Sequence, residues 1–194
     1  MRKKLILCVM LILAGLTVTA AAMQREQQRL ADKLIRLHVV ANSDSERDQQ
    51  VKLLVRDAVL SVTENLEKEE LSHALPAIRQ AAETCLAELG EEKAVRVTLG
   101  HERFPTRLYE SFALPAGTYQ TLRVTIGAGE GHNWWCVAFP SICMRATMAE
   151  LEDAAVSAGF TDGEIRLITA DSGPYVWKFK TLELLERLKE VLSS

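Results

Sequence analysis

The chain lacks the residue spacings from which metal centres and nucleotide sites are built. Its four histidines, at positions 38, 73, 101 and 132, are scattered, and no HxxxH, HExxH or CxxC spacing occurs. Zinc sites need such clusters of nitrogen and sulfur ligands. The glycine-rich stretch Gly127–Gly131 carries Glu130 and leads into a strand pattern, whereas a phosphate site normally sits at a helix N-terminus. We therefore expect neither a metal nor a cofactor.

An excess of positive charge is also missing. The 194 residues hold 23 Lys and Arg against 26 Asp and Glu. Loss of an N-terminal leader would remove three basic residues and no acidic ones, and would move the net charge from −3 to about −6. Modules that bind nucleic acid are normally basic with a clustered patch, so the composition argues against a nucleic-acid partner.

Long apolar runs are absent except at the N-terminus. A basic segment at positions 2–4 precedes the uncharged apolar run Leu5–Met23, whose small residues predict signal cleavage after Ala22. The run is also about 19 residues long, enough to span a bilayer as an uncleaved anchor. Both interpretations export the remainder. They divide the chain into a signal peptide or membrane anchor (1–22), a polar stalk (23–33) and a single exported domain (34–194).

Hydrophobic periodicity predicts an α+β fold in which an antiparallel or mixed sheet packs with several helices, preceded by the N-terminal signal or anchor helix. Alternating apolar residues predict strands at 34–41, 95–99, 119–126, 133–139, 165–169 and 175–179. Helical spacing predicts helices that carry the apolar residues of 51–62, 71–89, 147–158 and 184–192. A capping box, Ser43 with Glu46, is expected to start the first of these helices.

The segment Gly129–Cys143 has the most unusual composition of the chain, with adjacent tryptophans beside two cysteines. On a strand, Trp134 and Trp135 must point to opposite faces. An indole that is only partly hidden and has one N–H donor suits an interaction site. A central strand with both rings in the core is the competing interpretation. We also expect this strand to pair with 119–126 as an antiparallel hairpin across the glycine-rich loop.

The cysteines in this segment allow two chemical hypotheses. Cys136 and His132 could form a thiol nucleophile with its base, but on a strand they would lie about 13 Å apart. Cys136 and Cys143 could form a disulfide, because an exported chain can keep one and Phe139-Pro140 could reverse the chain between them. Two reduced, buried cysteines are the alternative.

Arg36 and His38 form the best polar cluster outside the tryptophan segment. They share one face of the strand at 34–41 and lie near the polar residues 42–44. One interpretation is structural, with these side chains capping the following helix. The other is a binding surface.

Three blocks of the sequence carry a family resemblance. They are, in order, IRLHVVANSDSERDQQVKLLVRDAVL, RFPTRLY and LPAGTYQTLRVTIGAGEGHNWWCVAFPSIC. Together they span roughly residues 34–143 and resemble stage II sporulation protein R. The stretch 144–194 is less diagnostic, and its role stays undetermined at this level.

The resemblance implies a signalling role and no enzymatic activity. Proteins of this family are made in the forespore and exported into the space between forespore and mother cell. There they activate a membrane-embedded aspartic protease of the mother cell, which processes pro-sigma-E. Membrane contact would come through the N-terminal segment if it is uncleaved. We expect the partner-binding surface to include Asn133, Trp134, Trp135, Arg36, His38, Arg103 and Arg107.

Two other functions are compatible with the residues. An exported thiol-dependent or cell-wall hydrolase would use Cys136 with a histidine. A membrane-anchored scaffold would use the uncleaved leader, although the small-residue site at 20–22 favours cleavage.

Overall fold

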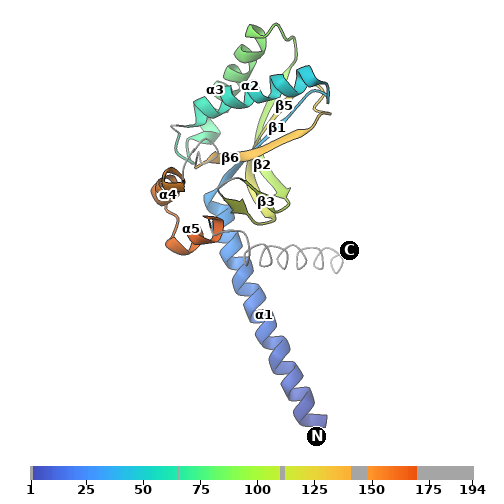
Figure 1. Cartoon of the computed structure of the whole chain (residues 1–194), viewed down its shortest axis with the longest axis vertical. Helices are drawn as coiled ribbons and strands as arrows, with labels where there is room; N and C mark the ends of the chain where they lie inside the picture. The colour runs from blue at the N-terminus through green and yellow to red at the C-terminus, as the bar shows by residue number, and fades with distance from the viewer. Residues whose placement is uncertain (1, 65, 110–111, 141–147, 170–194) are drawn as a thin grey trace.

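A strand that is buried along its whole length forms the centre of the fold. Every residue of β1 (Ile35–Val40) is buried, as expected between two packed layers. The computed structural model describes residues 2–64, 66–109, 112–140 and 148–169. It places β1 in a mixed sheet of order β2-β5-β1-β6 (Figure 1), with bounds Val95–Phe104 for β2, Gly117–Ile126 for β5 and Asn133–Phe139 for β6. The predicted α+β class with a mixed sheet is confirmed.

Two amphipathic helices cover one face of this sheet, as Figure 1 shows for α2 and α3. α2 (Glu46–Thr63) and α3 (Leu71–Glu88) bury their apolar stripes against alternate residues of the strands. The core on this face contains Leu37, Leu122 and Cys136, which therefore point toward the helices. Burying one leucine side chain is worth about 2 kcal/mol, so this layer supplies a large part of the fold's stability.

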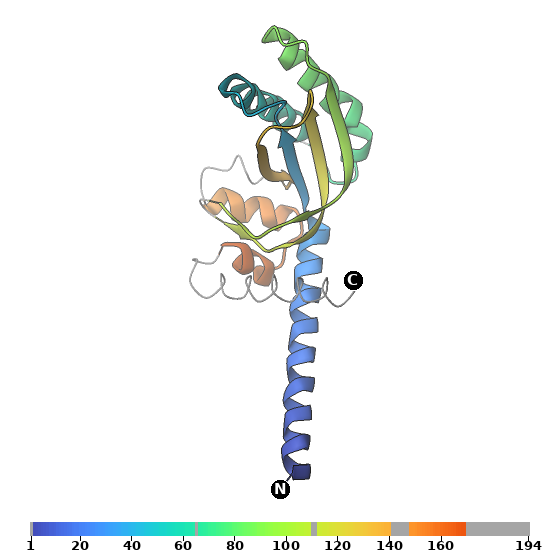
Figure 2. The same ribbon diagram turned by 90° about the vertical axis from the view of Figure 1, so that its right-hand side faces the viewer.

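A second core lies on the opposite face, at the end of the sheet where α1 enters (Figure 2). Side chains of the sheet, such as Phe104 and Tyr119, meet Leu30 and Leu34 there. The other elements that contribute to it are the short hairpin strands β3 (Arg107–Leu108) and β4 (Ala113–Leu114), and the helices α4 (Met148–Ser157) and α5 (Asp162–Thr169). The rest of this face is polar, so the two faces of the sheet are covered differently.

The N-terminal helix joins the apolar leader to this second core without a break. α1 (Arg2–Lys33) is long and apolar enough to cross a membrane, and none of its apolar window is buried inside the molecule. Its last turn behaves differently, because Leu30 and Ala31 are buried and Lys33 pairs with Glu164 at 2.6 Å. The predicted stalk at 23–33 is thus helical and ends inside the core.

The predicted hairpin between residues 119–126 and 133–139 is wrong. Both strands exist, but β1 lies between them, parallel to β5 and antiparallel to β6. β5 instead pairs antiparallel with β2, from Val95 opposite Ile126 to Phe104 opposite Gly117. The physical reason is that β1 is buried on both faces and needs neighbours on both edges, which a β5–β6 hairpin would deny it.

Two local predictions are corrected as well. The segment Ile165–Thr169 is part of helix α5, because residues 165 and 168 point into the core at helical spacing. Helix α2 begins two residues later than the capping box predicts: Ser45, not Ser43, is its N-cap and accepts a hydrogen bond from the backbone N–H of Asp48. The strand at 175–179, the C-terminal helix and Cys143 lie outside the described residues.

Asp48 connects the start of α2 to the turn that follows β1. Its Oδ2 accepts hydrogen bonds from Asn42 Nδ2 at 2.8 Å and Ser43 Oγ at 2.5 Å, and its Oδ1 lies 3.1 Å from Lys93 Nζ. These hydrogen bonds, that from Ser43 first, hold the pKa of this carboxyl well below its usual range. The polar residues after β1 therefore stabilise the N-terminus of α2 through their hydrogen bonds to Asp48.

Replacing Asp48 with Asn should lower the free energy of unfolding of residues 24–194 by about 2 to 3 kcal/mol at neutral pH, since hydrogen bonds to a buried charge are lost. The lowered pKa makes this stabilisation fully present above about pH 4 and lost as the pH falls further. Denaturant unfolding should therefore show the gap between wild type and Asp48→Asn narrowing below that pH. Asp57→Asn, on the same helix but half exposed, is the control; a gap that stays constant with pH contradicts the prediction.

Candidate docking site around strand β6

The adjacent tryptophans of β6 point to opposite faces of the sheet, as the alternation predicts. Trp134 stands opposite Val39 on the face that α2 and α3 cover. The guanidinium carbon of Arg56, from α2, lies 4.5 Å from the centre of its ring. The side chain is nevertheless 37% exposed. Trp134 is thus an accessible indole that a neighbouring cation holds in place.

Trp135 occupies the other face and is only partly exposed. Its ring packs edge-on against His38, with centroids 5.3 Å apart, and against Phe104 at 5.0 Å. Arg107, from β3, lies over it with its guanidinium carbon 4.4 Å from the ring centre. One indole therefore belongs mainly to the core and the other mainly to the surface, and the interpretation of a central strand with both rings in the core is wrong.

Arg36 is fully buried, which corrects its expected place on a partner-binding surface. Its Nε donates to the backbone carbonyl of Cys136 at 3.0 Å, and its Nη2 donates to the hydroxyl of Tyr109 at 2.7 Å. The guanidinium carbon lies 4.2 Å from the ring centre of Phe104 and 5.2 Å from that of Tyr119. Arg36 does not cap α2; it ties β6 and the β3–β4 hairpin to β1.

Burial changes the acid–base properties of this cluster. Loss of solvent lowers the pKa of Arg36 from its ordinary value, and the same cause raises the pKa of Tyr119 to about 12. Burial also raises the pKa of Tyr109. Both phenols therefore remain protonated at neutral pH, and each can donate a hydrogen bond: Tyr119 to the carbonyl of Pro115 and Tyr109 to that of Trp135.

His38 lies on the same face and is also buried, so it too is not available on the surface as predicted. Its Nδ1 lies 2.7 Å from Glu102 Oε2, and the other oxygen of Glu102 accepts from Arg123 at 3.3 Å. Among the residues that the structure describes, none forms a hydrogen bond with Nε2 of His38 or with Nε1 of Trp135. Buried polar atoms without a hydrogen-bond partner are rare in folded proteins, and here two of them lie where β1 and β6 meet.

The glycine-rich loop holds the start of β6 close to the turn after β1. A Cβ atom on Gly131 would come within 2.2 Å of the backbone oxygen of Ser43, so only glycine fits there. The backbone N–H of His132 donates to Asp44 at 2.6 Å, and Lys52 Nζ donates to the carbonyl of His132 at 3.0 Å. The loop therefore lies directly against the backbone of the turn after β1.

The surroundings of Cys136 do not support a thiol nucleophile. Its side chain is buried in the core that faces α2 and α3. His38 lies on the other face of the sheet, and the ring of His132 contacts Asp44. Cys136 is disulfide-bonded, whereas Cys8 and Cys85 are free thiols. The predicted partner Cys143 lies outside the described residues, so the pairing of Cys136 with Cys143 stays a prediction.

The remaining predicted residues lie apart from one another. Asn133 is exposed at the start of β6, next to Trp134, whereas Arg103 is exposed on β2, the far edge strand. Sequence reasoning missed Arg56 and Tyr109, which contact the two sides of β6. From the helical pattern alone, Arg56 is expected on the solvent-exposed face of its helix. No signal in the sequence connects that face with Trp134, which is 78 residues away.

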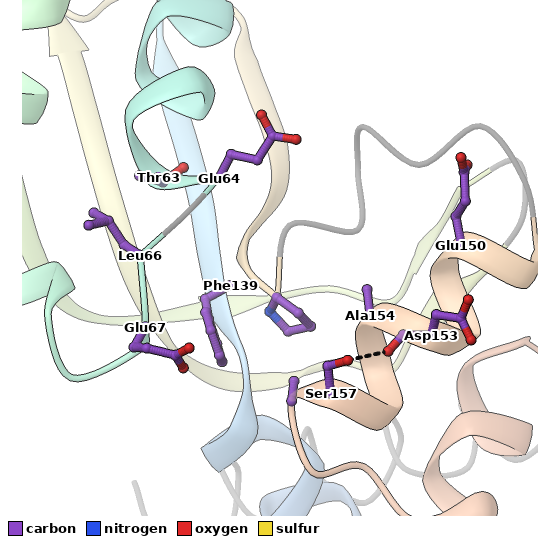
Figure 3. Close-up of a pocket in the computed structure, with 11 residues that line it drawn as sticks. Thr63, Glu64, Leu66, Glu67, Phe139, Glu150, Asp153, Ala154 and Ser157 are labelled. Atoms are coloured by element: carbon purple, nitrogen blue, oxygen red, sulfur yellow. Dashed lines mark hydrogen bonds between the residues drawn. The ribbon is translucent and has the colours of Figure 1, made fainter.

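The clearest pocket, of about 400 Å³, lies elsewhere, between the end of α2 and α4 (Figure 3). Glu64, Glu67, Glu150 and Asp153 surround it, with Phe139 at its base. Among the described residues no group of three or more His, Cys, Asp or Glu could hold a metal ion. The described lining of this pocket is therefore acidic.

Comparisons with known proteins agree with the three sequence blocks. The family model for stage II sporulation protein R matches residues 31–149, which run from the last turn of α1 to the start of α4. The chain belongs to this family. It is 33% identical over 192 residues to stage II sporulation protein R of Bacillus subtilis (strain 168), covering 88% of this chain and 86% of the relative. No solved structure matches.

Truncating the two tryptophans should separate their roles. Trp135→Ala should lower the free energy of unfolding of residues 24–194 by about 3 kcal/mol, because it removes packing against Phe104 and His38. Trp134→Ala should cost under about 1 kcal/mol, mainly its cation–π contact. Denaturant unfolding measures both. Equal costs for the two variants would contradict this assignment.

Proposed function

We propose that the protein is an exported sporulation signal that activates a membrane-embedded aspartic protease, which in turn processes pro-sigma-E. Membership of the stage II sporulation protein R family supports a role in sporulation. The exposed apolar window of α1 suits export as a signal peptide or anchor. The protein would act in the space between forespore and mother cell, and the peptide-bond chemistry would belong to the protease.

The observation that carries this proposal is the exposed, preorganised indole of Trp134. Tryptophan and arginine are the residue types that most often dominate binding energy at protein interfaces. Here Arg56 of α2 already contacts Trp134, which lies on a strand that pairs with β1 and whose preceding residue, His132, accepts a hydrogen bond from Lys52. A side chain fixed before binding loses less entropy when the partner arrives.

Activation by such a surface requires that it bind the active form of the protease more tightly than the inactive form. A difference of about 3 kcal/mol would raise the ratio of active to inactive protease about 150-fold. One buried tryptophan and a few polar contacts can supply a difference of that size. The surface around Trp134 is therefore sufficient in principle without any catalytic group in this chain.

A hydrolase based on Cys136 finds no support in the geometry. The sulfur of Cys136 is buried and disulfide-bonded, and the histidines at 38 and 132 contact Glu102 and Asp44 instead. A sulfur in a disulfide cannot act as a thiolate nucleophile.

Processing of pro-sigma-E should depend on this chain and on Trp134. Cells that express the candidate protease and pro-sigma-E, but no member of this family, should show processing only when the full chain is supplied. Trp134→Ala should reduce the processing rate at least tenfold at equal protein level, since it removes about 1.4 kcal/mol or more of differential binding. Immunoblots of the precursor and product measure the rate.

The matched control is Val156→Ala, which truncates a large apolar side chain that is 59% exposed on α4. This variant should process pro-sigma-E at the wild-type rate. Processing that occurs without the chain would refute the proposed function. Full processing by both Trp134→Ala and Val156→Ala would refute the role of Trp134.

A further inference from the structure

Strand β6 ends the sheet and carries an arginine–tryptophan pair on each of its faces. β6 lies beside β1 (Figure 2), and among the described strands none pairs with its other edge. On one face Arg56 lies 4.5 Å from the Trp134 ring, and on the other Arg107 lies 4.4 Å from the Trp135 ring. Two cations therefore flank one short stretch of an edge with which no described strand pairs.

This stretch is limited to the first half of the strand. The Tyr109 hydroxyl donates to the carbonyl of Trp135, and the following residue, Cys136, is disulfide-bonded. The edge that remains for a partner is Asn133–Trp135 without the carbonyl of Trp135, which the Tyr109 hydroxyl already occupies. Edge strands of this kind accept an added strand, because their outward N–H and C=O groups need partners.

The charge here differs from that of the whole chain. The net charge of the protein is −3, whereas around the start of β6 three cations, Lys52, Arg56 and Arg107, outnumber the two carboxylates of Asp44 and Asp57. Arg56 also bonds Asp57 at 2.7 Å, but a guanidinium has five N–H donors and can serve a second carboxylate. A local positive site on an acidic protein selects for an acidic partner segment and steers it by long-range attraction.

We propose that the edge at Asn133–Trp135 binds an extended acidic segment of a partner protein by strand addition. Successive side chains of a strand point to opposite faces, so two consecutive acidic residues would reach Arg56 on one face and Arg107 on the other. Backbone pairing would provide affinity, and the two arginines would select the acidic pair. That the partner is the sporulation protease rests on the proposed function; the binding preference does not.

The other edge of the sheet does not offer the same arrangement. On β2, Arg96 and Arg103 are seven residues apart, which corresponds to about 23 Å along a strand. Two consecutive acidic side chains cannot reach both. The spacing of acidic residues in a bound segment therefore distinguishes β6 from β2.

Three fluorescent nonapeptides with a Thr/Val background test the inference on the full chain in lipid nanodiscs. The first has two adjacent Glu, the second has two Glu separated by one residue, and the third has two adjacent Lys. Only the first places its acidic side chains on both faces of the added strand. Fluorescence anisotropy should give it at least tenfold higher affinity than the other two, with an affinity that falls as salt is raised.

A double variant, Arg56→Glu with Arg107→Glu, should lower the affinity for the adjacent-Glu peptide at least tenfold. Arg79→Glu, on the exposed side of α3, is the matched charge-reversal control and should leave it unchanged. An unchanged thermal unfolding midpoint establishes that both variants are folded. Equal binding of the three peptides, or unchanged binding by the double variant, overturns the inference.

N-methylation of the adjacent-Glu peptide at alternate residues adds a test of strand addition. Only one of the two alternating patterns should abolish binding, because only every second N–H faces β6. Equal effects of both patterns overturn the backbone pairing. In the processing assay, a double variant that supports full processing would reject the protease as the partner bound at this edge and leave the proposed function standing. Processing independent of the chain would reject the proposed function alone.

Discussion

The buried guanidinium of Arg36 is the interaction on which the architecture of the candidate site depends. It bonds the backbone of β6 and the hydroxyl of Tyr109, and it lies against the rings of Phe104 and Tyr119. These four residues come from four different strands or hairpins. A buried guanidinium that has lost its solvent needs these contacts, because the loss of any one of them leaves part of its charge uncompensated. The requirement fixes how β6 lies on β1.

The position of β6 then determines what each tryptophan does. With Trp135 packed against Phe104 and His38, alternation forces Trp134 to the opposite face, where Arg56 holds it at the surface. On the same strand, the hydrogen bond from Lys52 and the close approach at Gly131 fix the start of β6. A rigid surface for a partner thus follows from packing on the other face of the sheet.

Much of this fold could be predicted from the sequence, but the neighbours of each strand could not. Alternation gave the bounds of β6 correctly, as Asn133–Phe139, and the opposite faces of its tryptophans. It contains no information on pairing, so β1 between β5 and β6 was missed. Arg36 looked like a surface residue because charged side chains are rarely buried, and the rings around it come from residues 68 to 83 positions away.

We expect the protease to contact β6 at Trp134. A photoreactive amino acid in place of Trp134, in a sporulating cell that makes the protease at normal level, measures this contact directly. The predicted result is a covalent adduct with the protease from position 134 and none from position 79 on α3. An adduct from position 79 with none from 134, at equal protein levels, would contradict it.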